Sequence, residues 1–207
     1  NADGGVVDDI IIYRYSRERF FVCVNASNSD KDFAWFTQHN FSLQNKFKAD
    51  FQNQSSAWGQ VALQGPRAEK ILLSLAETKG LQDLGYFHFN ERTLFGERAI
   101  IARTGYTGED GFEIFYPWAK TPELWTALLE CGISYGLIPC GLGARDSLRL
   151  EACYPLHGHE LGDDISALES GLAWIVRFGK GDFLGRAALL KHKEQGPPRT
   201  LVGFFVE

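Results

Sequence analysis

The sequence predicts an α+β fold with antiparallel sheets and packed helices. Several short segments alternate apolar and polar residues with a period of two, as half-buried strands do. Short polar or glycine-containing stretches separate neighbouring segments of this kind, and such links favour hairpins. Helical segments occur between groups of strands without a regular strand–helix–strand alternation. This order favours an α+β fold over a parallel α/β fold.

The chain is expected to begin with a hairpin. Residues 6–15 and 20–26 have strand composition, and the polar stretch 16–19 joins them. A three-residue turn would place Asn25 opposite Asp9, whereas a two-residue turn would place Asn25 opposite Ile10.

A helix is predicted over residues 30–39, capped by the serine or aspartate at its start. A polar stretch with a short strand at 47–51 follows, and then a buried strand at 60–64. Gly65 and Pro66 start the next helix, which runs to about residue 76, because proline is favoured at the first helical position.

The second half continues in the same manner. Two strands, 92–94 and 98–104, are joined through a glycine turn, and a glycine-spaced loop leads into a strand at 111–116. An amphipathic helix at 121–131 and a helix containing Arg145 follow. The last predicted elements are a strand at 172–178 with Trp174 in the core, and a helix from 183 to about 193.

Composition limits the possible functions. The 207 residues, 44% hydrophobic and 14% aromatic, are enough for one large folded domain or two small ones. A net charge of −5 without a basic run argues against a nucleic-acid surface. The longest apolar stretches have the length of strands, so no membrane span is expected. The four cysteines lack CxxC spacing, which is typical of reduced thiols inside cells.

Two aspartates in the first predicted strand are candidate functional groups. Neighbouring strand residues point to opposite faces, so Asp8 and Asp9 are not expected to serve one site together. Asp9 shares a face with apolar residues, and a carboxylate in such surroundings is either an acid–base group or a strand-end acceptor of turn N–H groups. Asn25 alone is either a strand-end cap or a ligand contact.

The loop Gly105-Tyr106-Thr107-Gly108-Glu109-Asp110-Gly111 has glycine at every third position. Such a loop can turn tightly and expose backbone N–H groups, but it lacks the ending of a phosphate-binding P-loop. Glu113 follows on the face opposite Phe112 and Ile114, where it faces either solvent or a site.

Two arginines one turn apart follow the glycines at 141 and 143. Arg145 and Arg149 repel each other modestly, so we expect acidic partners such as Asp146, or an anion bound at the helix start. His157 and His159, with Cys153 nearby, match no standard zinc spacing, and we expect no metal.

Together these motifs resemble the glycine cleavage T-protein family of aminomethyltransferases. The resemblance rests on segments that occur in family order along the chain: Gly4 to Ile11, Val24-Asn25-Ala26, Lys31-Asp32, Leu63 to Pro66, Thr104 to Glu113, Gly141 to Ala152 and Asp182 to Arg186.

The resemblance implies a reaction and a site. Such proteins transfer the one-carbon unit from the aminomethyl-lipoyl arm of H-protein to tetrahydrofolate, releasing ammonia and forming 5,10-methylenetetrahydrofolate. By motif, Asp9 is the catalytic carboxylate beside the attacking folate nitrogen. The positions that contact folate are Asn25, Glu113, Arg145 and Tyr154.

The resemblance also implies a domain division. Residues 1–198 correspond to the folate-binding region, with two intertwined subdomains as one arrangement, and residues 199–207 begin a C-terminal β-barrel. The family's N-terminal segment and most of that barrel lie outside the chain, so we expect a central fragment. It is expected in the bacterial cytoplasm, or in the mitochondrial matrix if the source is eukaryotic.

Two other functions fit the same motifs less closely. One is the folate-binding domain of an enzyme that oxidises dimethylglycine or sarcosine, in which the one-carbon unit arises at a flavin. The other is a non-catalytic folate-binding protein. The close match of Gly-Leu-Gly-Ala-Arg-Asp, residues 141–146, favours the T-protein family over both.

Overall fold

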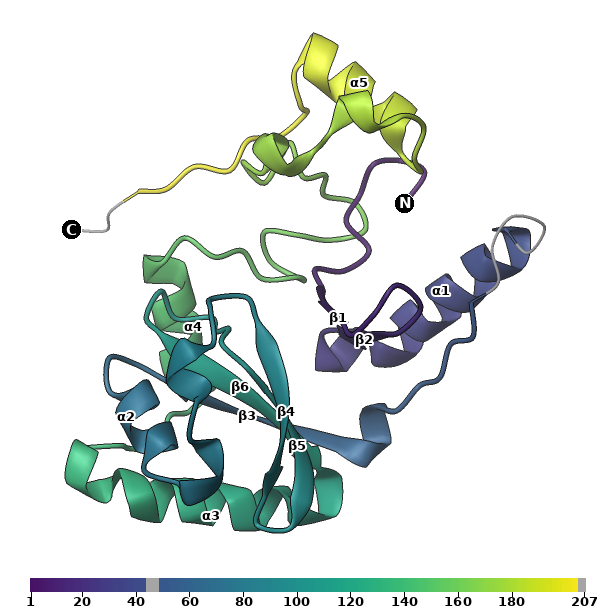
Figure 1. Ribbon diagram of the computed structural model, residues 1–207. Helices are drawn as coiled ribbons and strands as arrows, with labels where there is room; N and C mark the ends of the chain where they lie inside the picture. Colours follow the sequence, from purple (N-terminus) through teal and green to yellow (C-terminus); the bar gives the residue numbers. More distant parts are fainter. Residues whose placement is uncertain (44–48, 205–207) are drawn as a thin grey trace. The chain divides into compact units, whose positions relative to one another are not determined.

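The computed structural model describes residues 1–43 and 49–204 and divides the chain into two compact units (Figure 1). The first unit is discontinuous and combines Asn1–Phe51 with Pro155–Glu207. The second unit is the continuous stretch Gln52–Tyr154. The α+β class with antiparallel sheets is confirmed in both units.

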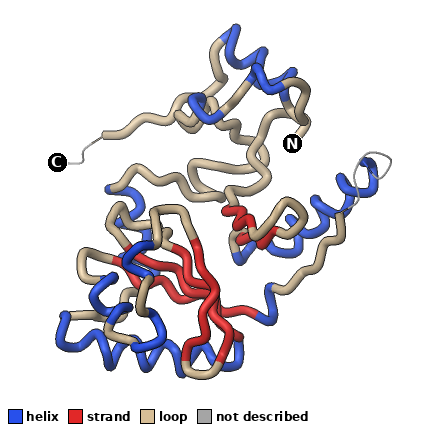
Figure 2. Tube along the Cα trace, viewed as in Figure 1, coloured by secondary structure: helices blue, strands red, loops and turns tan. Residues whose placement is uncertain are grey.

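The second unit is built on an antiparallel sheet, whose strands are red in Figure 2. Its four strands follow the order β3-β6-β5-β4. The central pairing aligns Leu63 of β3 with Phe112 of β6, and Ile101 of β5 with Ile114 of β6. The strands are β3 Trp58–Gln64, β4 Phe89–Leu94, β5 Glu97–Ala102 and β6 Gly111–Pro117.

Two helices, α2 (Ala68–Leu73) and α3 (Thr121–Gly132), pack against one face of this sheet. The core between them contains alternate residues of each strand, because side chains of a strand alternate between faces. The sheet contributes Val61, Leu63, Leu94, Ala99, Ile101, Phe112, Ile114 and Tyr116, and the helices contribute Ala68, Ile71, Leu72, Leu124 and Leu128. The intervening residues, Glu113 among them, therefore lie on the other face. The described residues of this unit also form the helix α4, Leu142–Glu151.

The first unit begins with the hairpin of β1 (Ile11–Arg14) and β2 (Phe20–Cys23). Arg14 pairs with Phe20 and Ile11 with Cys23, which is the register of the three-residue turn. Continued by two residues, this register brings Asp9 opposite Asn25. The helix α1, Ser29–Leu43, follows as predicted but extends further.

The N-terminal segment is held by a distant part of the same unit. The backbone N–H of Val6 donates to the carbonyl oxygens of Gly162 and Ile165 at 2.9 and 3.1 Å, and Gly5 forms an isolated bridge with Ser166. These contacts replace the first half of the predicted strand 6–15, which was wrong over residues 6–10. The last helix of the unit is α5, Arg186–Gln195.

Three other local predictions differ from the structure. The predicted strand 172–178 contains instead the 3₁₀ turn Ala173–Ile175, and Trp174 is 70% exposed. The helix predicted from residue 65 forms only as α2. Of the predicted strand 47–51, residues 47 and 48 lie outside the described residues, and 49–51 form no strand.

The last residues of the chain do not test the predicted start of a barrel. Residues 201–204 have no regular secondary structure, and 205–207 lie outside the described part, so the barrel start at 199–207 stays a prediction. Among the helices of the described residues, none has the length and apolar character that a membrane crossing requires.

Candidate functional site

Asp8, Asp9 and Asn25 form a hydrogen-bonded group in the first unit. The side-chain amide of Asn25 donates to Asp8 Oδ1 at 2.7 Å and to Asp9 Oδ1 at 2.8 Å. The backbone N–H of Asn25 donates to Asp8 Oδ2 at 3.0 Å. Both aspartates precede β1, so strand alternation does not separate them. The prediction that they cannot share a site was therefore wrong.

A second layer of side chains holds Asp8. Asn28 Nδ2 donates to Asp8 Oδ1 at 2.8 Å and lies 3.1 Å from His157 Nδ1. His157 Nε2 lies 3.1 Å from the carbonyl oxygen of Val6. Because a carbonyl can only accept, the geometry assigns the proton to Nε2 and makes Nδ1 the acceptor from Asn28. His157 is thus a structural link between the aspartate segment and the loop that follows residue 155.

The two aspartates have pKa shifts of opposite sign. Desolvation raises the pKa of Asp9, and the charge of Asp8 adds to this effect, while the hydrogen bond from Asn25 opposes it. Burial alone would raise the pKa of Asp8, but hydrogen bonds from Asp32, Asn25 and Asn28 outweigh it and lower the pKa. The donors around Asp8 favour its ionised form. The carboxylate of Asp9 is partly desolvated although the residue as a whole is accessible to solvent, so Asp9 is the group better suited to exchange a proton.

Lysine 31 fixes the backbone at the start of this segment. Lys31 Nζ donates to the carbonyl oxygen of Val7 at 2.6 Å and lies 3.6 Å from the carboxylate of Asp163. The described residues contain no group of three or more His, Cys, Asp or Glu side chains arranged to hold a metal ion. The ring nitrogens of His157 are directed at Asn28 and Val6 instead.

Glu113 lies in the second unit, at the centre of the sheet face opposite α2 and α3. It pairs with Ala62 on β3 and Ala102 on β5. Its Oε1 accepts a hydrogen bond from Gln60 Nε2 at 2.6 Å, and its Oε2 accepts one from the buried hydroxyl of Thr104. A half-buried carboxylate with these donors is oriented by its neighbours, so Glu113 is not a freely solvated side chain.

The glycine-spaced loop encloses the side chain of Gln64. Gln64 Nε2 donates to the carbonyl oxygens of Thr104 at 3.1 Å and Phe112 at 3.2 Å. A Cβ atom on Gly105 would lie 1.8 Å from Gln64 Oε1, so a larger residue here would force Gln64 out of its hydrogen-bonded position. Gly108, with φ +77°, supplies the left-handed turn of the loop. The loop therefore has a structural reason for its glycines and a fixed shape.

Arg145, Tyr106 and Tyr154 stack on one another beside this loop. The guanidinium of Arg145 lies 4.5 Å from the ring centre of Tyr106, whose ring lies 5.8 Å from that of Tyr154 at an interplanar angle of 19°. Tyr86 is in hydrogen-bond contact with the side chain of Tyr154. This group presents flat aromatic surfaces and one cation, which suits a planar, anionic ligand.

The second arginine of α4 has a different role. Arg149 is 3% exposed; its Nε donates to Asp146 at 2.8 Å and its Nη1 donates to the Tyr154 carbonyl oxygen at 3.1 Å. The predicted partnership with Asp146 is thus confirmed for Arg149. Arg145 contacts an aromatic ring instead, and its side chain is exposed.

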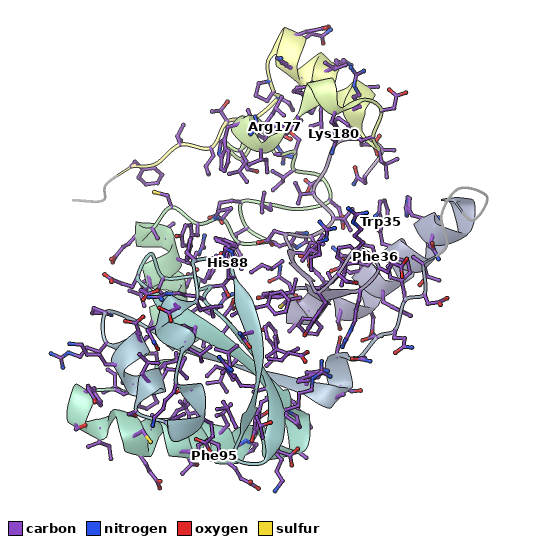
Figure 3. The ribbon with its side chains drawn as sticks, viewed as in Figure 1. Trp35, Phe36, His88, Phe95, Arg177 and Lys180 are labelled. Carbon is purple, nitrogen blue, oxygen red and sulfur yellow. The ribbon has the colours of Figure 1, made fainter. Side chains whose placement is uncertain are left out.

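In Figure 3, His88 and Phe95 mark the two ends of the β4–β5 hairpin. The backbone bond from Arg103 N–H to the His88 carbonyl oxygen places the end of β5, and so the start of the glycine loop, at the His88 end. Arg103 forms an ion pair with Asp110 at 2.6 Å across this loop. The Tyr106 group is therefore attached to a rigid sheet end.

The five predicted site residues thus fall into two local groups. Asp9 and Asn25 lie in the first unit, in direct contact, and Glu113, Arg145 and Tyr154 lie in the second. Sequence reasoning missed Asn28 and Tyr106. The position of Tyr106 within the glycine-spaced loop was the available signal, whereas nothing near Asn28 in the sequence indicated its contacts.

The comparison with protein families shows to which family the chain belongs. The model of the GCVT N-terminal domain matches residues 1–180. The chain belongs to the GCVT family. Its similarity to individual GCVT-family proteins covers almost the whole chain, as their sequences and a solved structure demonstrate.

Several bacterial relatives bear the name aminomethyltransferase. That of Moorella thermoacetica is 51% identical over 201 residues, which are 97% of this chain and 54% of the relative. That of Desulfitobacterium hafniense strain DCB-2 is 50% identical over 200 residues, 97% of this chain and 53% of the relative. The crystal structure of the glycine cleavage system aminomethyltransferase T from Bartonella henselae matches with a TM-score of 0.81 at 33% identity, covering 97% of this chain and 52% of that one. The GCVT-family chain thus spans about half the length of the relatives it matches.

Proposed function

We propose that this chain is the tetrahydrofolate-binding part of a glycine cleavage aminomethyltransferase. The single observation that carries the proposal is its 50% identity to a protein named aminomethyltransferase over 97% of the chain. The local geometry supports it, because an exposed carboxylate with a raised pKa, Asp9, is oriented by Asn25. Enzymes place such a group where a proton must be taken up and released.

The proposed reaction moves one carbon between two carriers. The carbon of an aminomethyl group on the lipoyl sulfur of H-protein loses its bonds to nitrogen and sulfur. It gains bonds to the two neighbouring nitrogens of tetrahydrofolate. The two protons from these nitrogens leave with ammonia and the lipoyl thiol, so atoms and electrons balance without an oxidant.

We assign Asp9 the task of holding the attacking folate nitrogen and handling its proton. Asn25 keeps the Asp9 carboxylate in place through its 2.8 Å hydrogen bond. Glu113 is proposed to accept hydrogen bonds from the amino edge of the pterin, which is rich in N–H donors. Arg145 and Tyr154 are proposed to contact the folate through the cation and the stacked ring.

The alternative folate-dependent functions have less support. No observation on this chain favours a flavin-linked oxidation of dimethylglycine or sarcosine over aminomethyl transfer, and the relatives named above are aminomethyltransferases. Those relatives are bacterial, so we propose the bacterial cytoplasm as the compartment.

The test is a transfer assay with the full-length protein that contains this chain. Aminomethylated H-protein and tetrahydrofolate are supplied, and ammonia and 5,10-methylenetetrahydrofolate are measured. Equal amounts of both products, dependent on folate, support the proposal. Folate binding without either product would instead favour a non-catalytic folate-binding protein, and absence of folate binding would contradict both.

A further inference from the structure

Asp32 is a buried carboxyl group with no role in the proposed reaction. It lies in the first turn of α1 and is 3% exposed. Within the described residues, neither of its carboxylate oxygens receives a hydrogen bond from a donor. An ionised carboxylate that is desolvated and without donors is very costly, so the group requires another explanation.

The buried carboxyl group of Asp32 interacts with the carboxylate of Asp8, and each of the two influences the pKa of the other. Two ionised carboxylates only accept hydrogen bonds and repel each other, so their interaction is favourable when one of them carries a proton. Asp8 already accepts three hydrogen bonds from N–H groups of Asn25 and Asn28, which favour its ionised form. The proton therefore belongs to Asp32.

The other charged groups near Asp32 do not reverse this assignment. Lys31 favours the ionised form, but its ammonium group is bonded to Val7 and lies close to Asp163. The charges of Asp8 and Asp163 oppose ionisation of Asp32. The ring nitrogens of His157 are directed at Asn28 and at the carbonyl oxygen of Val6. The helix start favours an anion, but this effect is small beside desolvation and a contacting carboxylate.

We propose that Asp32 is a positioning residue that stays protonated and donates a hydrogen bond to Asp8, which orients Asn25 and, through Asn25, the carboxylate of Asp9. The chain of contacts runs Asp32–Asp8–Asn25–Asp9 within the first unit. The pKa of Asp32 supports the assignment. Burial, and to a smaller extent the interaction with Asp8, raises this pKa to about 7. The catalytic part of this inference rests on the proposed function; the protonation of Asp32 does not.

Infrared difference spectroscopy tests the protonation without an activity assay. The full-length protein at about pH 5, below the raised pKa of Asp32, is expected to show the C=O stretch of a buried protonated carboxyl group. That band should be missing from Asp32→Asn and present in Asp30→Asn, the matched control in the same helical turn with an exposed side chain. A band unchanged in Asp32→Asn would overturn the inference even if the enzyme is fully active.

Stability gives a second readout with a defined sign. Asp32 binds its proton more tightly in the folded than in the unfolded chain, so its contribution is full below the unfolded pKa and is lost as pH rises to about 7. Asp32→Asn keeps the donor at every pH. Its melting temperature relative to the parent should therefore rise by at least about 2 °C between pH 5 and 8. A difference that is constant with pH, as for Asp30→Asn, would contradict the proposal.

The positioning role is tested by two substitutions with opposite expectations. Asp32→Asn should keep kcat within about threefold, whereas Asp32→Leu, which cannot donate, should lower kcat about tenfold or more with folate KM little changed. The pH–rate profile of the parent should change near pH 7, where Asp32 ionises. That change should be missing from the profile of Asp32→Asn. Equal loss of kcat in both variants would show that the donor is irrelevant and would overturn the positioning role. If the parent itself has no transfer activity, the proposed function fails while the infrared result still decides the protonation.

Discussion

The guanidinium of Arg145 lies over the ring of Tyr106 at 4.5 Å. This contact joins helix α4 to the glycine-spaced loop within the second unit. The cation is exposed, and no carboxylate among the described residues forms an ion pair with it. A guanidinium in this position is available to a ligand while its orientation is already restricted.

Replacing Arg145 by alanine is therefore expected to weaken folate binding. We expect Kd for tetrahydrofolate to rise about tenfold, as for loss of one oriented charged contact, with little change in melting temperature. Titration calorimetry of the full-length protein measures both the affinity and the enthalpy. Lys79→Ala, which removes an exposed cation elsewhere in the same unit, should leave Kd unchanged. An equal loss in both variants would point to a general charge effect.

Asp9→Asn tests the catalytic carboxylate. Turnover should fall by about two to four orders of magnitude, as for removal of a positioned acid–base group, while folate affinity and melting temperature stay close to the parent's. Single-turnover kinetics with aminomethylated H-protein measure the step itself. A variant with nearly normal turnover would contradict the role of Asp9, and an inactive Asp8→Asn beside an active Asp9→Asn would transfer that role to Asp8.

Asp8→Asn should lower stability in addition to disturbing the position of Asn25. Its carboxylate accepts hydrogen bonds from Asn25 and Asn28, and an amide would leave some of these donors unpaired at a cost of about 1–3 kcal/mol in the free energy of unfolding. The lowered pKa of Asp8 fixes the pH dependence: its stabilisation is present above the unfolded pKa of about 4 and is lost as pH falls through the folded pKa. Urea unfolding at pH 7 should therefore separate parent and variant more than unfolding at pH 3.

Gly105→Ala tests the close packing of the glycine loop. The new methyl group would lie 1.8 Å from Gln64 Oε1, so the loop or Gln64 must move, and we expect a loss of about 1–3 kcal/mol in the free energy of unfolding. Gln64→Ala in the same chain should restore part of this loss because it removes the obstructing atoms. A double-mutant cycle by denaturant unfolding measures the coupling, and strictly additive effects would show that the two residues do not interact.

Local patterns predicted the sheet and helices of the second unit well, because its strands alternate between a buried face and the opposite face. Strand alternation correctly placed Glu113 on the face opposite Phe112 and Ile114. The same reasoning failed at Asp8 and Asp9, where backbone bonds from Val6 to Gly162 and Ile165 end the extended pairing early. No periodicity in residues 6–15 contains information about a partner some 150 residues away.

The candidate site was predictable only in part, because some of its contacts join segments that lie far apart in the sequence. The residues implied by the family resemblance include Asn25, and its contact with Asp9 follows from the hairpin register. The burial of Asp32 and the contact of Asn28 with His157 depend on how α1 packs within the first unit, which spacing does not determine. The apolar run around Trp174 indicated a strand, but it adopts a 3₁₀ turn between two glycine-containing stretches.

The discontinuous first unit has a consequence for the order of folding during synthesis. The inserted stretch Gln52–Tyr154 can complete its sheet as soon as it leaves the ribosome, whereas Val6 and Asn28 must wait for Gly162 and His157 to be made. Pulsed hydrogen exchange during refolding should protect the amides of β6 before that of Val6. The segment that carries Asp9 would then be among the last parts to become ordered, so an incompletely synthesised or clipped chain would hold a finished sheet while the proposed acid–base group remained unformed.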